Sequence, residues 1–413
     1  MINKLWLCLC LTITPGLIHT SEEEPLRFWK DSKGREIIGE LVASDGVRAT
    51  LRVEDNSKKV FPLSFFSGAD QQFITSWRSE HPEAPWIDSE AMPAWPQMIG
   101  KGVSEVKQMP SDDSRTPHVW RSRHFDMRSD MKLPLSVVRD MATIFEATRL
   151  AVHFLPLGLA ASPPVSSGQI RLEQTYPELK YNPDLLRVQL YGDNKLFAQA
   201  GAPAGSGGFY QTMLNRTVLS LDNLGIKGKK GAFRGDYMKN AFVLKHEITH
   251  HLLHDWTPYL PIWFTEGFAE YMGAASYSEG QYKFVSMDRH LHKYLNRWRF
   301  NEDPNRIPIM KLEDLMTITH SDWVSQLKRS TPIIEYNSAA VIVHFFIHHD
   351  GKGDAAHLAA YLDAIRQGIH PSKAEKTHLL RDRTYEQLGR ELVIVWKNNK
   401  VALEPFGDVD PFK

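Results

Sequence analysis

The sequence predicts the α+β fold class, with a small β unit ahead of a larger domain in which strands precede helices. Residues 26–77 contain short strand-like runs separated by turn residues. Between residues 119 and 221, strand-like alternation flanks one helical segment, and from residue 236 onward the apolar spacing is mostly helical. This order differs from the alternating strands and helices of a parallel α/β fold. A length of 413 residues favours two or three domains.

The first twenty residues predict a signal peptide, 1–20. Lys4 precedes a short apolar run at residues 5–13, and a Pro-Gly pair follows it. The run is shorter than the roughly 20 apolar residues that cross a bilayer, so we expect no stable membrane span and a secreted, periplasmic or cell-envelope protein of bacterial type. Both cysteines lie in this segment. Any metal bound by the mature chain would therefore need His, Asp or Glu ligands.

The charge balance argues against one class of partner. The chain has a formal net charge of +0 and a pI of about 7.3. No overall positive field would attract nucleic acid, so we expect no nucleic-acid partner.

Residues 26–77 predict a small SH3-like β-barrel. Strand-like runs at 37–42, 49–53 and 59–63 alternate with turn-forming residues. The segments Arg-Phe-Trp-Lys-Asp at 27–31 and Phe-Pro-Leu-Ser-Phe-Phe-Ser-Gly-Ala-Asp-Gln at 61–71 resemble the first homology domain of the yeast Sla endocytic adaptor. The resemblance implies a Sla-type homology domain that binds a peptide motif or an envelope partner. A folded spacer is the alternative.

Residues 78–118 have the composition of a Pro-rich linker, because six prolines interrupt them. The second domain, 119–405, is expected to begin with a strand at 120–127. An amphipathic helix at 135–155 follows, and the runs 187–191 and 217–221 alternate like strands.

The strongest chemical signal is His-Glu-Ile-Thr-His at 246–250. Residues 239–254 have a helical apolar stripe, so His246 and His250 lie one turn apart on another face of the same helix. Two imidazoles placed in this way bind one Zn²⁺. Glu247, beside the first ligand, is the expected general base for a metal-activated water.

A second predicted helix supplies two candidate carboxylates. It begins near Pro261 and places Glu266 and Glu270 one turn apart on one face. Spacing alone leaves both open as the third ligand. His254 lies about 12 Å along the helix from His246 and cannot share its ion, and His251 points about 100° away from His250.

Residues 263–269, Trp-Phe-Thr-Glu-Gly-Phe-Ala, resemble a segment of gluzincin metallopeptidases in the peptidase MA-like superfamily, distantly similar to the aminopeptidase N family. The resemblance implies a zincin-like metallopeptidase domain of a small sheet plus a mostly helical C-terminal part. It implies that Glu266 is the third zinc ligand and that Glu270 orients a ligand imidazole.

The segment that begins at Tyr336 resembles the aminopeptidase segment whose tyrosine stabilises the oxyanion, although Ser338 replaces a lysine. The alternatives are a tyrosine that merely packs at a helix start, or His344 as the donor. No Gly-x-Met-Glu-Asn segment is present, which favours an endopeptidase or a restricted substrate over a general aminopeptidase. Residues 207–210 and the strand after them are expected to offer an edge to which an extended peptide adds.

The expected function is therefore a secreted zinc metallopeptidase that holds one Zn²⁺ per chain and cleaves a peptide or protein substrate. The alternative is a non-catalytic envelope protein that binds peptides or proteins and has a structural or vestigial zinc site. The intact Glu247 favours the enzyme, because a structural site needs no base beside its ligands.

Overall fold

The computed structural model describes residues 27–406 except 32, 54, 56, 82–83, 85–94, 101–104, 112, 161–184, 204, 230–231, 236–240, 299–302 and 328–332. The expected signal peptide, 1–20, lies outside the described residues. Among the residues that are described, no helix is both long enough and apolar enough to cross a membrane.

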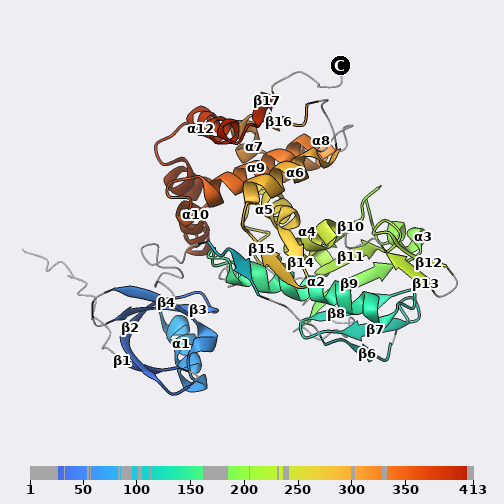
Figure 1. Cartoon of the computed structure of the whole chain (residues 1–413), viewed down its shortest axis with the longest axis horizontal. Coiled ribbons are helices and arrows are strands. Elements are labelled where there is room, and N and C mark those ends of the chain that lie inside the picture. The colour runs from blue at the N-terminus through green and yellow to red at the C-terminus, as the bar shows by residue number, and fades with distance from the viewer. Residues whose placement is uncertain are drawn as a thin grey trace, which may run out of the picture.

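The N-terminal unit is a four-stranded antiparallel sheet with one helix on it (Figure 1). Strands β1 (Arg27–Lys30), β2 (Glu36–Ser44), β3 (Arg48–Val53) and β4 (Lys58–Pro62) pair in chain order. They contain the three predicted runs almost entirely. A short 3-10 turn, η1 (Leu63–Phe65), leads into helix α1 (Gly68–Glu80).

These four strands do not close into the expected barrel. The edge strands β1 and β4 do not pair with each other, and only an isolated bridge joins Asp31 to Phe66. Helix α1 instead covers the sheet, because Asp70 in its first turn accepts hydrogen bonds from Arg27 Nη2 at 2.6 Å and from the Lys30 backbone N–H at 2.9 Å. In a closed barrel, β1 would pair with the other edge strand, β4. Here these bonds connect β1 to helix α1.

Part of the range expected to be linker, 78–118, belongs to sheets of the larger unit. Strand β5 (Met98–Ile99) pairs with β15, and β6 (Lys107–Met109) pairs with β7. Helix α1 also runs two residues past the predicted boundary at 78. The strands are too short to be recognised by alternation in a Pro-rich sequence.

A mixed six-stranded sheet forms the middle of the chain, in the order β10-β11-β9-β8-β7-β6. Helix α2 (Leu135–Phe154) connects β8 to β9, which pair in parallel, and β9 is also parallel to β11. Strand β10 pairs only with β11 and is an edge. The strands are β7 (His118–Arg121), β8 (Phe125–Ser129), β9 (Leu186–Tyr191), β10 (Gly208–Gln211) and β11 (Arg216–Ser220).

The single strand expected at 120–127 is two strands, β7 and β8, joined by a turn. Glu146 of α2 accepts hydrogen bonds from Ser122 Oγ at 2.7 Å and from the His124 backbone N–H at 2.9 Å. These bonds stabilise the turn, because its hydrogen-bond donors find an acceptor on helix α2. Local alternation does not reveal such a partner.

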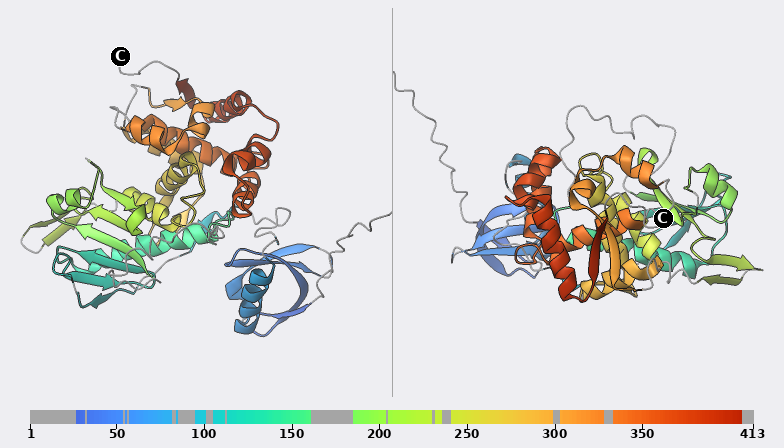
Figure 2. Two further views of the ribbon diagram at one scale, coloured as in Figure 1. Left: turned by 180° about the vertical axis from the view of Figure 1, so that it is seen from behind. Right: turned by 90° about the horizontal axis from the view of Figure 1, so that it is seen from above.

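The C-terminal half is largely helical, and Figures 1 and 2 show it standing beside the sheet. Helix α5 (Ile262–Ala274) lies between α4 (Ala241–Leu252) and α9 (Ile333–His348), and almost all of it is buried. The strands-then-helices order agrees with the predicted α+β class. The remaining elements are α3 (Asn194–Gln199), η3 (Thr212–Leu214), β12 (Ile226–Lys229), β13 (Ala232–Gly235), β14 (Ser276–Ser278), β15 (Gln281–Lys283), α6 (Met287–Leu295), η4 (Asn296–Trp298), β16 (Arg306–Met310), α7 (Leu312–Thr317), α8 (His320–Leu327), α10 (Ala356–Arg366), α11 (Pro371–Ala374), the π-helix η5 (Glu375–Leu380), α12 (Tyr385–Asn398) and β17 (Ala402–Phe406).

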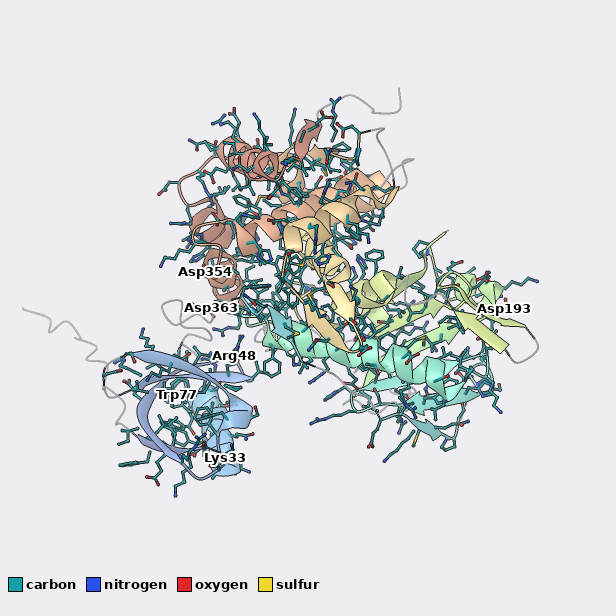
Figure 3. All side chains as sticks on the ribbon, in the orientation of Figure 1. Lys33, Arg48, Trp77, Asp193, Asp354 and Asp363 are labelled. Carbon is teal, nitrogen blue, oxygen red and sulfur yellow. The ribbon has the colours of Figure 1, made fainter. Side chains whose placement is uncertain are left out.

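The N-terminal unit contacts the rest of the chain through Arg48 (Figure 3). Its guanidinium donates to the carbonyls of Phe154 and Leu155 at 3.2 and 3.1 Å, at the C-terminal end of α2. Asp45 holds the same guanidinium through two hydrogen bonds of 2.9 and 2.6 Å. A positive group is favoured there because the last carbonyls of a helix are unpaired and carry partial negative charge.

Candidate metal centre

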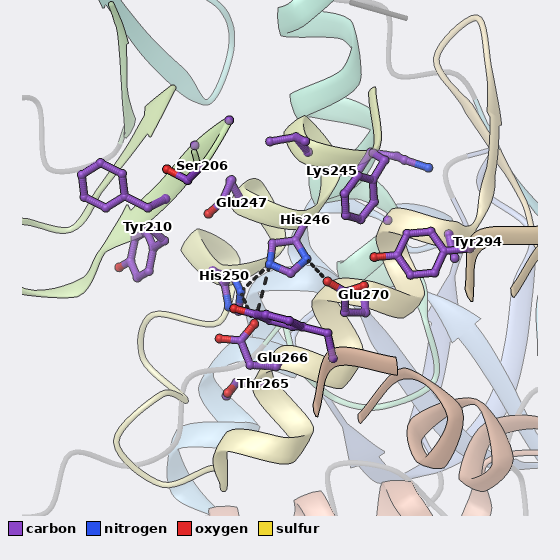
Figure 4. A pocket seen from close by; sticks show the side chains of 18 of the residues that line it. Ser206, Tyr210, Lys245, His246, Glu247, His250, Thr265, Glu266, Glu270 and Tyr294 are labelled. Carbon is purple, nitrogen blue, oxygen red and sulfur yellow. Dashed lines mark hydrogen bonds and ion pairs between the residues drawn. The ribbon is translucent and has the colours of Figure 1, made fainter. Parts of the chain in front are cut away.

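Helix α4 brings two imidazoles together. Leu244 and Ile248 are fully buried and pack among the residues of the sheet-and-α2 core, which turns another face of α4 toward α5. On that face the Nε2 atoms of His246 and His250 are 3.0 Å apart (Figure 4). The prediction that His246 and His250 lie one turn apart on one face of a helix is therefore matched by their geometry.

Helix α5 adds a carboxylate from the opposite side. Glu266 Oε2 lies 3.3 Å from His250 Nε2 and 3.7 Å from His246 Nε2. One ligand atom from each of the three residues lies within 4.8 Å of the others. Spacing in the sequence left Glu266 and Glu270 equivalent, and tertiary packing distinguishes them.

The three residues fit one divalent cation. Glu266 Oε2 is buried and has no hydrogen-bond partner, which is unfavourable for a carboxylate unless a cation satisfies it. The pKa of Glu266 is lowered, since the charges of His250 and His246 outweigh the effect of burial, which raises it. Two imidazoles and one carboxylate form a donor set that zinc accepts in proteins.

Glu270 lies outside the trio and contacts the far side of the first imidazole. Its Oε1 is 3.2 Å from His246 Nδ1, and its Oε2 accepts a hydrogen bond of 3.3 Å from Arg297 Nη2. Burial lowers the pKa of His246, but Glu270 and the other nearby carboxylates reverse this and raise it to about 9. Glu270 therefore contacts Nδ1 of His246, the ring nitrogen opposite the Nε2 that faces His250 and Glu266.

Sequence reasoning missed Arg297. It follows Glu270 by 27 residues, in η4 after α6, and its guanidinium lies 3.4 Å from the centre of the Tyr294 ring. No motif connects it to the first histidine, because the contact depends on how α6 packs beside α5. A lone arginine in a polar stretch carries no local signal for this role.

Glu247 is 8% exposed and lines the same cleft as the trio. Burial raises its pKa, and the charges of His246 and His250 partly offset that rise. Strand β10 runs close beside it: a Cβ at Gly208 would lie 3.1 Å from Glu247 Cγ and 2.5 Å from Leu219 Cδ2. Glycine at this position lets the edge strand approach the carboxylate.

Tyr336 lies in the first turn of α9 and also lines the cleft. Its ring is 6.4 Å from the His246 ring and 5.6 Å from that of Trp323, centre to centre. Ser338, where the similar family has lysine, accepts a hydrogen bond of 2.7 Å from the Met310 backbone N–H and so ties α9 to β16. His344 is fully buried and is not among the cleft-lining residues, so the alternative donor is not placed at this site.

The two further histidines, His251 in α4 and His254 just after it, have other partners. His251 is 1% exposed, and its Nδ1 is 3.1 Å from Thr217 Oγ1 of β11. His254 Nδ1 lies 2.5 Å from the Tyr210 hydroxyl of β10. His251 therefore attaches α4 to the sheet, and His254 attaches the turn that follows α4.

The cleft has a volume of about 1390 Å³ and is lined by β10, α4, α5, α6 and the start of α9. Figure 4 shows His246 between Glu270 on one side and His250 with Glu266 on the other, and Glu247 facing the strand that carries Tyr210. His320, at the start of α8, also lines the cleft, and the sequence did not single it out.

Comparisons with known proteins place the chain in no family. A scan against protein-family models finds no match, and no curated protein matches the chain.

Proposed function

We propose that the chain is a secreted zinc-dependent peptidase with a gluzincin-like catalytic domain of the zincin-like type. One observation carries the proposal: three ligand atoms on α4 and α5 converge in a cleft that also contains Glu247, a carboxylate outside the ligand trio. A structural metal site needs no such group beside it and no open cleft. The resemblance of residues 263–269 to gluzincins supports the same assignment of Glu266.

His246, His250 and Glu266 would hold one Zn²⁺, with Glu270 and Arg297 keeping the His246 ring in place. Zinc, when bound, supplies a Lewis acid that polarises the scissile carbonyl and makes water more acidic. Glu247 accepts a proton from the attacking water and then delivers it to the nitrogen of the leaving amine. Tyr336 donates a hydrogen bond to the carbonyl oxygen as negative charge develops on it.

Strand β10 supports a peptide as the substrate. It is an edge strand in the described sheet, and Gly208, Phe209 and Tyr210 line the cleft beside Glu247. The unpaired backbone groups of an edge strand bind an extended peptide by adding it as a further strand. This mode of binding selects an unfolded segment or loop rather than a folded surface.

The N-terminal unit is proposed to act as a Sla-type binding module. Its resemblance to that domain at 27–31 and 61–71 supports binding of a peptide motif or an envelope partner. The apolar segment at 5–13 supports export.

The alternative function is a non-catalytic envelope protein with a structural or vestigial zinc site. The cleft would then bind a peptide or protein without hydrolysing it. Glu247, buried beside the ligand trio, is the feature that favours the enzyme.

The variant Glu247→Gln separates the two functions. We expect hydrolysis of an unstructured protein or a quenched peptide library to fall by about 10²–10⁴-fold, the usual contribution of a general base. Zinc content should stay unchanged in Glu247→Gln and fall by one ion per chain in His246→Ala. Glu386→Gln, an exposed glutamate whose side chain is 80% accessible, is the matched control and should behave as wild type. If wild type and Glu247→Gln are equally inert across the library while both bind zinc, the binding protein is the correct function.

A further inference from the structure

A second group of potential ligands lies outside the cleft, between α6 and the end of α9. Asp288 is in the first turn of α6, His344 is in α9, and His349 directly follows α9. Asp288 Oδ1 is 3.1 Å from His344 Nε2 and 2.9 Å from His349 Nε2. One ligand atom from each of the three residues lies within 4.8 Å of the others.

His344 is the unusual member of this group. Its side chain is completely buried, its Nδ1 has no hydrogen-bond partner, and its Nε2 faces Asp288 Oδ1 at 3.1 Å. Trp396 and His348 surround it, with ring centres 5.5 and 4.9 Å away. A buried imidazole and a second imidazole therefore converge on one carboxylate oxygen, an arrangement that a cation between the three groups can satisfy.

The remaining contacts suit a cation as well. A single Asp288 oxygen facing two Nε2 atoms at these separations matches the spacing between neighbouring ligands of a zinc-sized ion.

Solvent reaches this site, so an ion can enter it and water can serve as a further ligand. The Asp288 side chain is 39% accessible and that of His349 is 22% accessible, so water can complete the coordination. Asn399, just past α12, places its side-chain amide 3.4 Å from Asp288 Oδ2. The cluster thus joins α6, α9 and the end of α12.

We propose that Asp288, His344 and His349 form a second divalent-cation site of the imidazole–carboxylate class, which zinc suits best. Its role is structural, because no residue of the cluster lines the large cleft. The ion fastens α6, whose Tyr294 packs on Arg297, to α9, whose first turn carries Tyr336. The proposal depends only on these residues and holds whether or not the chain is a peptidase.

Calorimetric titration of Zn²⁺ into the metal-depleted full chain tests the site. We expect two ions per chain for wild type and one for His246→Ala, which lacks a ligand of the cleft. In the double variant His246→Ala/His349→Ala the remaining affinity should fall about 100-fold, because one of the three protein ligands is lost. Because His349 is partly exposed, this variant should keep its fold, and circular dichroism checks that it does.

His357 supplies the matched control. Its Nδ1 pairs with Asp350 Oδ2 at 2.8 Å, but these two belong to no group of three metal-ligating residues among the described part of the chain. His246→Ala/His357→Ala should therefore keep the second ion, and His246→Ala/Asp288→Asn should bind it about 100-fold more weakly, as His246→Ala/His349→Ala does. Zinc should also raise the Tm of His246→Ala and leave that of His246→Ala/Asp288→Asn unchanged.

Two results would overturn the proposal. One is a single ion in wild type and none in His246→Ala, which would make the cluster an ordinary ion pair. The other is an ion in His246→Ala whose affinity is unaffected by both Asp288→Asn and His349→Ala. Neither result depends on whether a peptide is cleaved.

Discussion

Replacing Gly267 by alanine tests whether close packing of α5 against α9 positions the candidate metal ligand Glu266. A Cβ at residue 267 would lie 2.2 Å from the Ala339 carbonyl oxygen and 2.8 Å from Val343 Cγ2. Ordinary contact begins near 3.4 Å, so widening 2.2 Å to 3.4 Å requires a shift of about 1.2 Å. The obstacle is backbone, and it cannot rotate away as a side chain would.

The expected magnitude follows from two opposing terms. Overpacking against a fixed backbone costs about 3 kcal/mol, whereas alanine in place of glycine inside a helix recovers about 1 kcal/mol. The net loss of about 2 kcal/mol should lower Tm by roughly 4–8 °C. A shift of that size also exceeds the roughly 0.2 Å tolerance of a zinc–ligand distance, so zinc affinity should fall at least about tenfold.

The assay combines thermal unfolding with zinc titration of Gly267→Ala. The control is Gly389→Ala in α12, where the nearest atoms to a new Cβ belong to Leu312 at 3.9 Å. That variant should be as stable as wild type or gain up to about 1 kcal/mol. If Gly267→Ala keeps both the wild-type Tm and the wild-type zinc affinity, the α5–α9 contact does not position Glu266.

Three further predictions test individual contacts. Glu270→Gln should weaken zinc binding in the cleft by about 10–100-fold while stability changes little, because His246 loses its charged partner; equal affinity by titration would contradict this. Tyr336→Phe should lower kcat about 10²–10³-fold with little change in KM, and an unchanged kcat would assign the tyrosine to packing alone. Arg48→Met should release the N-terminal unit from α2 without unfolding it, seen as faster cleavage between the two units in limited proteolysis, with the exposed Arg35→Met as control.

The local parts of the candidate site were predictable. Two histidines four residues apart on a helix, and two glutamates four residues apart on the next, share faces because helical geometry dictates it. The exclusion of His254 follows from the rise along the same helix. In the structure these features agree with the prediction, and the functional assignment itself stays a proposal.

Contacts between distant segments were not predictable. Arg297 reaches Glu270 across 27 residues, and His349 reaches Asp288 across 61. Strands β5 and β6 have two and three residues, too few for alternation to appear, and each exists because a partner strand lies beside it. The open N-terminal sheet also involves a contact between distant segments, because Asp70 of helix α1 accepts hydrogen bonds from β1.

The sequence by itself determined which candidate metal-binding groups are available: a His-Glu-x-x-His helix, two carboxylates on a following helix, and no cysteine outside residues 1–20. Only the tertiary structure decided which carboxylate meets both imidazoles. Glu266 lies opposite the two Nε2 atoms, and Glu270 lies against Nδ1 of His246. The physical reason is that spacing within a helix determines which side chains share a face, whereas the carboxylate that meets the imidazoles depends on how α4 and α5 pack against each other.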